Sequence, residues 1–231
     1  MKFIKLTILN LVIIGLFGVI SFVYAENLEE DIAERTAKVE TALYFSIEEA
    51  NTLQKEFKAV PLSEDKRELQ KYAQLEALLN SDIEWYFNKL GSLQTTEFKD
   101  AEEVRAFALQ IIEYREKIYI ETDIEVSNFV SFIYSGDVIT KASETLSKLI
   151  EEDATGVYKT ELDKTAALIK EAGELRAGAE ANILPPLESI EPIEEVTIEV
   201  ESDQPPTTKE LLDKALANIK TAYEIILELA I

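Results

Sequence analysis

Apolar and small residues recur at alternating steps of three and four along most of this chain. The first such run lies between about Glu26 and Val60, and it contains no glycine or proline. Its members are Thr36, Val39, Leu43, Ser46, Ala50, Leu53, Phe57 and Val60. This is the a/d spacing of coiled coils and antiparallel helix bundles, so it predicts one long helix with a single buried stripe.

The same spacing predicts a second helix from about Ser63 to Leu90. Pro61 separates it from the first helix, and Ser63 is a suitable N-cap residue. Gly91 stands where a helix C-terminus favours a left-handed residue, so residues 92–99 are expected to form a loop. The expected stripe is Leu69, Tyr72, Leu75, Leu79, Ile83, Tyr86 and Leu90.

A third helix is expected to start at Asp100, which has the spacing of a capping box with Glu103. Its inward stripe is Val104, Ala108, Ile111, Ile118, Thr122, Val126, Phe129 and Ile133, with Arg115 at the remaining step. Residues 118–126 also alternate as a strand does, so helix and strand both stay open there, and the flanking stripe favours helix. Gly136 either kinks this helix or ends it before a restart capped by Asp137.

Three more segments complete the predicted set of helices. One ends near Glu152 before a turn at Gly156, the next runs from Tyr158 to Ile183, and the last covers 209–231. Thr207 and Glu210 form a second capping box before the last helix. The predicted fold class is all-α: an elongated antiparallel bundle, or coiled-coil-like hairpins, of about five to six helices after an N-terminal segment.

The N-terminal segment, residues 1–25, has the order of an export signal. Lys2 and Lys5 precede an uncharged run of 20 residues from Leu6 to Ala25, and Val23-Tyr24-Ala25 fits signal-peptidase cleavage after Ala25. The run is also about long enough to span a bilayer. We therefore predict a signal peptide over 1–25, with a retained membrane anchor as the alternative. Both predict an extracytoplasmic location, in the periplasm, at the cell surface or outside the cell.

The composition excludes several classes of function. The net charge is −22, a balance that repels phosphate backbones and anionic headgroups. We therefore expect no nucleic-acid partner, and membrane contact only through residues 1–25 if they are not cleaved. The chain has no histidine and no cysteine, so triads, thiol chemistry, ordinary zinc sites and disulfide bonds are ruled out.

The acidic residues show no catalytic or metal-binding spacing. The runs 29–31, 102–103 and 151–153 lack the pattern of a calcium loop, and no glycine-rich phosphate loop is present. We predict no catalytic residue, no cofactor and no metal ligand, and hence a protein that is not an enzyme. A hydrolase that uses two carboxylates is the enzymatic alternative.

Residues 184–208 divide the rest of the chain into a helical bundle domain (26–183) and a C-terminal amphipathic helix (209–231). This stretch has five prolines and seven acidic residues but no lysine or arginine, a composition typical of an extended linker. The helices on its two sides resemble each other, because residues 161–174 and 211–224 are identical at eight of fourteen positions. Similar packing demands account for this likeness, and it also allows the last helix to dock beside the preceding one, in the same chain or in a neighbour.

Two apolar features suggest contacts with a partner. Trp85 falls outside the stripe of its helix, and residues 118–134 are apolar on more than one face. Both can pack inside the bundle, but both also suit a contact surface, so the candidate contacts are Trp85, Phe129, Phe132 and Tyr134. The leading hypothesis is a non-enzymatic, exported structural or protein-interaction protein of the cell envelope, which binds a protein partner or itself. The alternative is an extracytoplasmic protein that binds cations or small ligands on its acidic surface.

Overall fold

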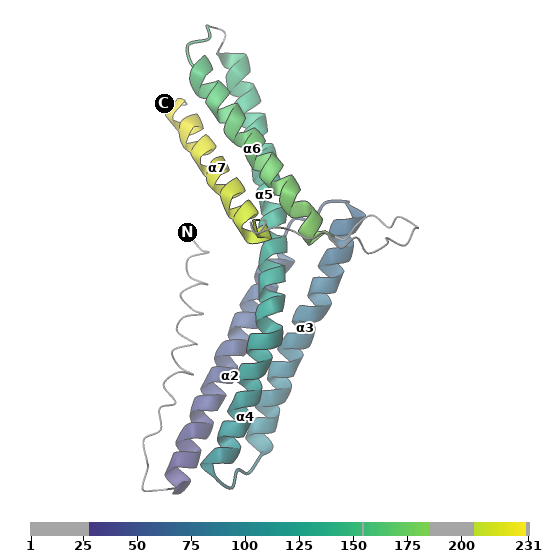
Figure 1. The fold of residues 1–231 in the computed structure, drawn as a ribbon, viewed down its shortest axis with the longest axis vertical. Coiled ribbons are helices and arrows are strands. Elements are labelled where there is room, and N and C mark those ends of the chain that lie inside the picture. The colour runs from purple at the N-terminus through teal and green to yellow at the C-terminus, as the bar shows by residue number, and fades with distance from the viewer. Residues whose placement is uncertain (1–27, 154, 185–205, 230–231) are drawn as a thin grey trace, which may run out of the picture. The chain divides into compact units, whose positions relative to one another are not determined.

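The computed structural model describes residues 28–153, 155–184 and 206–229, and within these ranges the fold is all-α. Its elements, shown in Figure 1, are α2 (Leu28–Lys58), α3 (Lys66–Thr95), α4 (Ala101–Tyr114), the π-helical segment η1 (Arg115–Tyr119), α5 (Ile120–Glu152), α6 (Lys159–Ile183) and α7 (Thr208–Leu229). The predicted signal peptide and most of the predicted linker lie outside the described residues. None of the helices described here is both long and apolar enough to cross a membrane.

The chain forms two compact units, and the boundaries between them fall at the end of α2 and inside α3 and α5. Unit 1 takes in the chain up to Lys58 together with residues 75–123, and unit 2 takes in residues 59–74 and the chain from Ile124 onward. The sequence suggested a single bundle domain over 26–183 and did not indicate this division. The predicted C-terminal helix, α7, belongs to unit 2.

Unit 1 is held together by the stripe of α2, which packs with α4 and buries the predicted residues. Six members of that stripe are at most 4% exposed, namely Val39, Leu43, Ser46, Ala50, Leu53 and Phe57. Leu75, Leu79 and Tyr86 of α3 and Ile111 of α4 are fully buried in the same unit. The spacing of the stripes therefore predicted the core of unit 1 correctly along most of these helices.

Unit 2 is built on the packing of α5, α6 and α7. One apolar cluster in this unit consists of Ala142 and Leu146 of α5, Leu162, Ile169 and Ala172 of α6, and Ala215, Ile219 and Ala222 of α7. The repeated positions of α6 and α7 lie in this core, because Leu162, Ile169 and Ala172 correspond to Leu212, Ile219 and Ala222, all at most 7% exposed. Equal packing demands on two neighbouring helices therefore explain the sequence likeness.

Two predicted caps and one predicted turn are confirmed. The Asp100 carboxylate accepts hydrogen bonds from the backbone N–H groups of Glu102 (3.0 Å) and Glu103 (2.9 Å), at the first turn of α4. The Thr207 N–H donates to the Glu210 carboxylate at 2.8 Å before α7. Gly156 has a φ of +70° in the turn between α5 and α6, a conformation that favours glycine.

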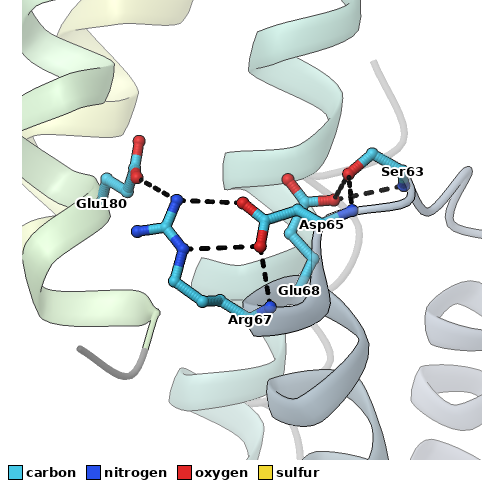
Figure 2. A network of polar contacts seen from close by, with 5 residues as sticks. All are labelled: Ser63, Asp65, Arg67, Glu68 and Glu180. Carbon is cyan, nitrogen blue, oxygen red and sulfur yellow. Dashed lines mark hydrogen bonds and ion pairs between the residues drawn. The ribbon is translucent and has the colours of Figure 1, made fainter. Parts of the chain in front are cut away.

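The start of α3 differs from the prediction, and Figure 2 shows why. Asp65, not Ser63, caps the helix, because its carboxylate accepts from the Arg67 backbone N–H at 2.7 Å. Ser63 instead donates its hydroxyl to Glu68 at 2.6 Å. The Arg67 guanidinium contacts both Asp65 (2.9 Å) and Glu180 of α6 (2.8 Å), so it ties the first turn of α3 to the end of α6 within unit 2. Leu69, predicted to be buried, is 45% exposed.

Neither predicted helix break at a glycine is present. α3 continues past Gly91 to Thr95, and α5 continues past Gly136 to Glu152 without a restart at Asp137. Gly136 leaves space for Arg176, since a Cβ atom there would lie 2.9 Å from Nε of Arg176. The guanidinium of Arg176 lies 3.8 Å from the centre of the Phe132 ring and donates to the Phe132 carbonyl at 3.2 Å.

Residues 118–126 are helical, so the strand alternative is wrong. The register of the stripe also differs from the prediction, because η1 replaces a regular turn with a wider π-helical one. Tyr119 is fully buried as a result, whereas Ile118, the residue expected inside, is 47% exposed. The stripe follows the predicted register again from Thr122, which is 6% exposed, to Val126, which is fully buried.

The two helical glycines provide a matched test of this packing. Gly91→Ala is expected to raise the stability of the chain by about 1 kcal/mol, because alanine favours helix and no atom lies within 4 Å of the new Cβ. Gly136→Ala is expected to lose that gain, because the Arg176 guanidinium must move. Urea denaturation of both variants measures the difference, and an equal gain in both would show that the contact with Arg176 is not important.

Candidate functional site

A row of aromatic side chains lies where α3 meets α4 in unit 1, and we call it the aromatic seam. Its rings are Trp85 of α3, Phe98 of the connecting loop, and Phe107 and Tyr114 of α4. Lys89 of α3 lies over the rings of Trp85 and Phe107 and is counted as part of the seam. All five side chains are half-buried. The rings of Trp85 and Tyr114 are stacked, with centroids 3.7 Å apart and an angle of 5° between their planes. Phe98 and Phe107 meet edge to face at 5.7 Å. Each ring is therefore held by a neighbour while part of it faces solvent.

Lys89 joins the two halves of the seam. Its Nζ atom lies 5.3 Å from the ring centres of both Trp85 and Phe107, and it donates a hydrogen bond to the Gln110 side chain at 2.6 Å. A cation above two aromatic faces is attracted by both rings. The lysine therefore adds one positive charge to an apolar strip on a chain of strongly negative net charge.

The stacked pair of Trp85 and Tyr114 is anchored by a hydrogen bond to the buried carboxylate of Asp82. The Tyr114 hydroxyl donates to Oδ1 of Asp82 at 2.5 Å, and Asp82 is 2% exposed. Burial, together with this hydrogen bond, raises the pKa of Tyr114 above its usual range, so the hydroxyl keeps its proton at neutral pH. The Tyr114 ring is thus fixed in place, and it fixes the orientation of Trp85.

A buried ion pair lies deeper in unit 1, next to η1. The guanidinium of Arg115 donates to both oxygens of Glu49 of α2, at 2.6 and 3.2 Å, and their side chains are 7% and 4% exposed. The guanidinium also lies 5.3 Å from the centre of the Tyr119 ring. This two-pronged geometry joins α2 to η1 at a single register, because an arginine fork fits a carboxylate in only a few orientations.

Several polar atoms around this pair have no partner in the described part of the chain. They are Oδ2 of Asp82 and the hydroxyl oxygens of Ser46 and Tyr119. Burial raises the pKa of Tyr119, so its hydroxyl stays neutral. Buried polar atoms of this kind are usually paired, and the stretch of helix beside them is π-helical, a feature found often at functional sites.

The four predicted contact residues have different surroundings. Trp85 is half-buried in the aromatic seam, and Tyr134 is 36% exposed, with its hydroxyl donating to the Ala59 carbonyl at 3.4 Å. Phe129 and Phe132, also predicted as partner contacts, are fully buried and expose no surface in the described chain. The Arg176 guanidinium covers one face of the Phe132 ring, 3.8 Å from its centre.

Asp82, Lys89, Phe107 and Tyr114 were not among the residues predicted to form a site. The signal for Asp82 was present, since strict steps of four and three from Leu75 lead through Leu79 to Asp82 and then Tyr86. The predicted stripe used Ile83 because an acid at a core position conflicts with its polarity. The other three could not be found from spacing, because their meeting depends on how α3 and α4 pack. Among the described residues, no three acidic side chains lie close enough to hold a metal ion.

The buried ion pair leads to a clear prediction for stability. Glu49→Gln is expected to lower the free energy of unfolding by about 3–5 kcal/mol, because it leaves the Arg115 charge buried without a carboxylate. Glu48→Gln is the matched control, since Glu48 is exposed on the same helix and should change stability by less than about 0.5 kcal/mol. Urea denaturation gives both values, and equal effects would contradict the role of the pair.

Two tyrosine variants test the polar atoms around the pair. Tyr119→Phe removes a hydroxyl that has no partner in the described residues, so the protein is expected to be unchanged or more stable, by up to about 1 kcal/mol. Tyr114→Phe leaves the buried Asp82 carboxylate without its donor and is expected to cost about 1–3 kcal/mol. Thermal unfolding followed by circular dichroism compares them. A large loss in Tyr119→Phe would show that ordered water satisfies its hydroxyl.

Comparison of the chain with protein-family models, with curated proteins and with solved structures found no match in any of the three.

Proposed function

We propose that this chain is a non-enzymatic protein-interaction module, exported through the cytoplasmic membrane, which binds another protein through the aromatic seam of unit 1. The observation that carries the proposal is the stacked pair of Trp85 and Tyr114, half-buried and anchored on Asp82. Tryptophan and tyrosine are the residues that most often dominate binding energy at protein interfaces.

The geometry of the seam favours binding because little entropy remains to be lost there. The Trp85 ring is held by Tyr114, and Tyr114 is held by its hydrogen bond to Asp82 at 2.5 Å. A side chain that already has its bound orientation avoids about 0.5–1.5 kcal/mol of ordering cost on association. Phe107 and Lys89 extend the same strip, so a partner helix can lay an apolar face along it.

The composition supports the non-enzymatic part of the proposal. With no histidine and no cysteine, the chain lacks the imidazole that most often acts as a general base or metal ligand, and it lacks any thiol nucleophile. The apolar run from Leu6 to Ala25 behind two lysines supports export, and the net charge of −22 favours a partner with basic residues around its apolar contact.

Trp85→Ala is expected to weaken partner binding at least tenfold while lowering the melting temperature by only a few degrees. The partner would be isolated from the envelope fraction of the source cells with the tagged full chain, and its affinity measured with purified proteins. Trp85 is the single tryptophan of the chain, so its fluorescence reports directly on the seam when the partner is added.

Phe87→Ala is the matched control, because Phe87 lies two residues away on α3, is 51% exposed and is not part of the seam. It should bind as the unaltered chain does. Loss of binding in proportion to loss of melting temperature would show that Trp85 is only a packing residue. Equal weakening by both variants would place the contact outside the seam.

A further inference from the structure

The second surface of interest is the groove of unit 2 that holds α7. The groove is formed by Ala142 and Leu146 of α5 and by Leu162, Ile169 and Ala172 of α6. The face of α7 that fills it is Leu212, Ala215, Ile219, Ala222 and Ile226, each at most 5% exposed. Alanines on both sides let the helices approach closely, so the groove fits a helix with this spacing of small and large residues.

The contacts of α7 are made by side chains and do not depend on how α7 is connected to α6. Besides the apolar face of α7, an ion pair between Lys214 and Glu171 at 3.3 Å joins the two helices, with both side chains largely exposed. Leu211 also lies against Gly178, 3.6 Å from where a Cβ atom would stand. An α7 helix from a second copy of the chain would make the same contacts.

Neither the helix nor the groove is expected to persist without the other. A single helix of 22 residues is marginal in water, and the apolar face of α7 would be exposed if it left the groove. The groove would likewise expose Ile169 and Leu146. A free α7 and an empty groove are therefore both unfavourable, which favours exchange of α7 between copies over its release.

The connection to α7 is far longer than docking in the same chain requires. Gly178 lies beside Leu211 and Glu171 beside Lys214, so α6 and α7 run antiparallel, and α6 ends where α7 begins. Antiparallel neighbours need a loop of only about 2–5 residues. This chain has residues 184–207 between the two helices, which can span roughly 80 Å when extended.

We propose that α7 is exchanged between two copies of this chain, so that the groove of each copy holds the α7 helix of the other. A connection of this many residues gives α7 an effective concentration of about a millimolar at its own groove. Exchange is therefore governed by concentration: dilute chains keep their own α7, and chains concentrated to about a millimolar form dimers. This inference goes beyond the proposed function and does not use the aromatic seam.

The chain has no cysteine, so single cysteines can carry fluorescent labels on the full-length protein. One pool carries a donor at Lys170→Cys on α6 and the other an acceptor at Lys220→Cys on α7, two positions with side chains 80% and 79% exposed. The pools are incubated together at about 1 mM and then diluted. Energy transfer is expected to develop during incubation and to decay only slowly after dilution. Absence of transfer at 1 mM would overturn the proposal.

The matched control removes residues 188–203 and leaves eight linker residues, which still allow α7 to reach its own groove. Shortening the connection raises the effective concentration in the same chain about fivefold, so transfer between copies should fall by about that factor. Unchanged transfer would overturn the proposal by placing the association elsewhere. The Trp85→Ala variant should exchange α7 between copies as the unaltered chain does. Loss of partner binding in this variant would therefore concern only the seam, and loss of energy transfer between copies would concern only the exchange of α7.

Discussion

Burial of one apolar stripe per helix is the interaction on which this structure depends, because the chain has no cysteine that could form a disulfide bond. In α2 the stripe is buried almost completely from Val39 to Phe57, and α7 buries an equivalent stripe from Leu212 to Ile226. Each methylene removed from water contributes about 0.8 kcal/mol, so a long stripe outweighs any single surface ion pair. Exposed ion pairs one turn apart, such as Lys38 with Glu34 on α2 and Lys220 with Glu224 on α7, are therefore of secondary importance.

The polar groups inside unit 1 have a different role from the stripes. An ion pair such as that of Arg115 and Glu49 gives little net stability, since both charges lose their hydration when buried. Its geometry, however, allows one register between α2 and η1, and Asp82 fixes Tyr114 in the same way. The buried polar side chains therefore determine which side chains face solvent at the seam, whereas the apolar stripes supply the energy that holds the helices together.

The two units differ in how they expose apolar surface. Unit 1 displays aromatic rings whose positions are fixed by stacking and by buried hydrogen bonds, which suits recognition of another protein. Unit 2 covers its groove with α7, a helix that follows a long connection. The seam proposed as a contact surface and the groove proposed to exchange α7 involve different residues, so the two proposals can be tested independently.

The sequence by itself determined that this protein is helical, where most helices begin, and which stripes are buried, because steps of three and four and capping residues are local properties. It correctly placed the caps at Asp100 and Thr207 and the turn at Gly156. Only the tertiary structure decided what depends on packing between helices: that Gly136 makes room for Arg176, that η1 turns Tyr119 inward, and that Asp82 lies beneath Tyr114. Helix periodicity specifies one face of a helix, but the neighbour that covers that face is fixed only when the helices pack.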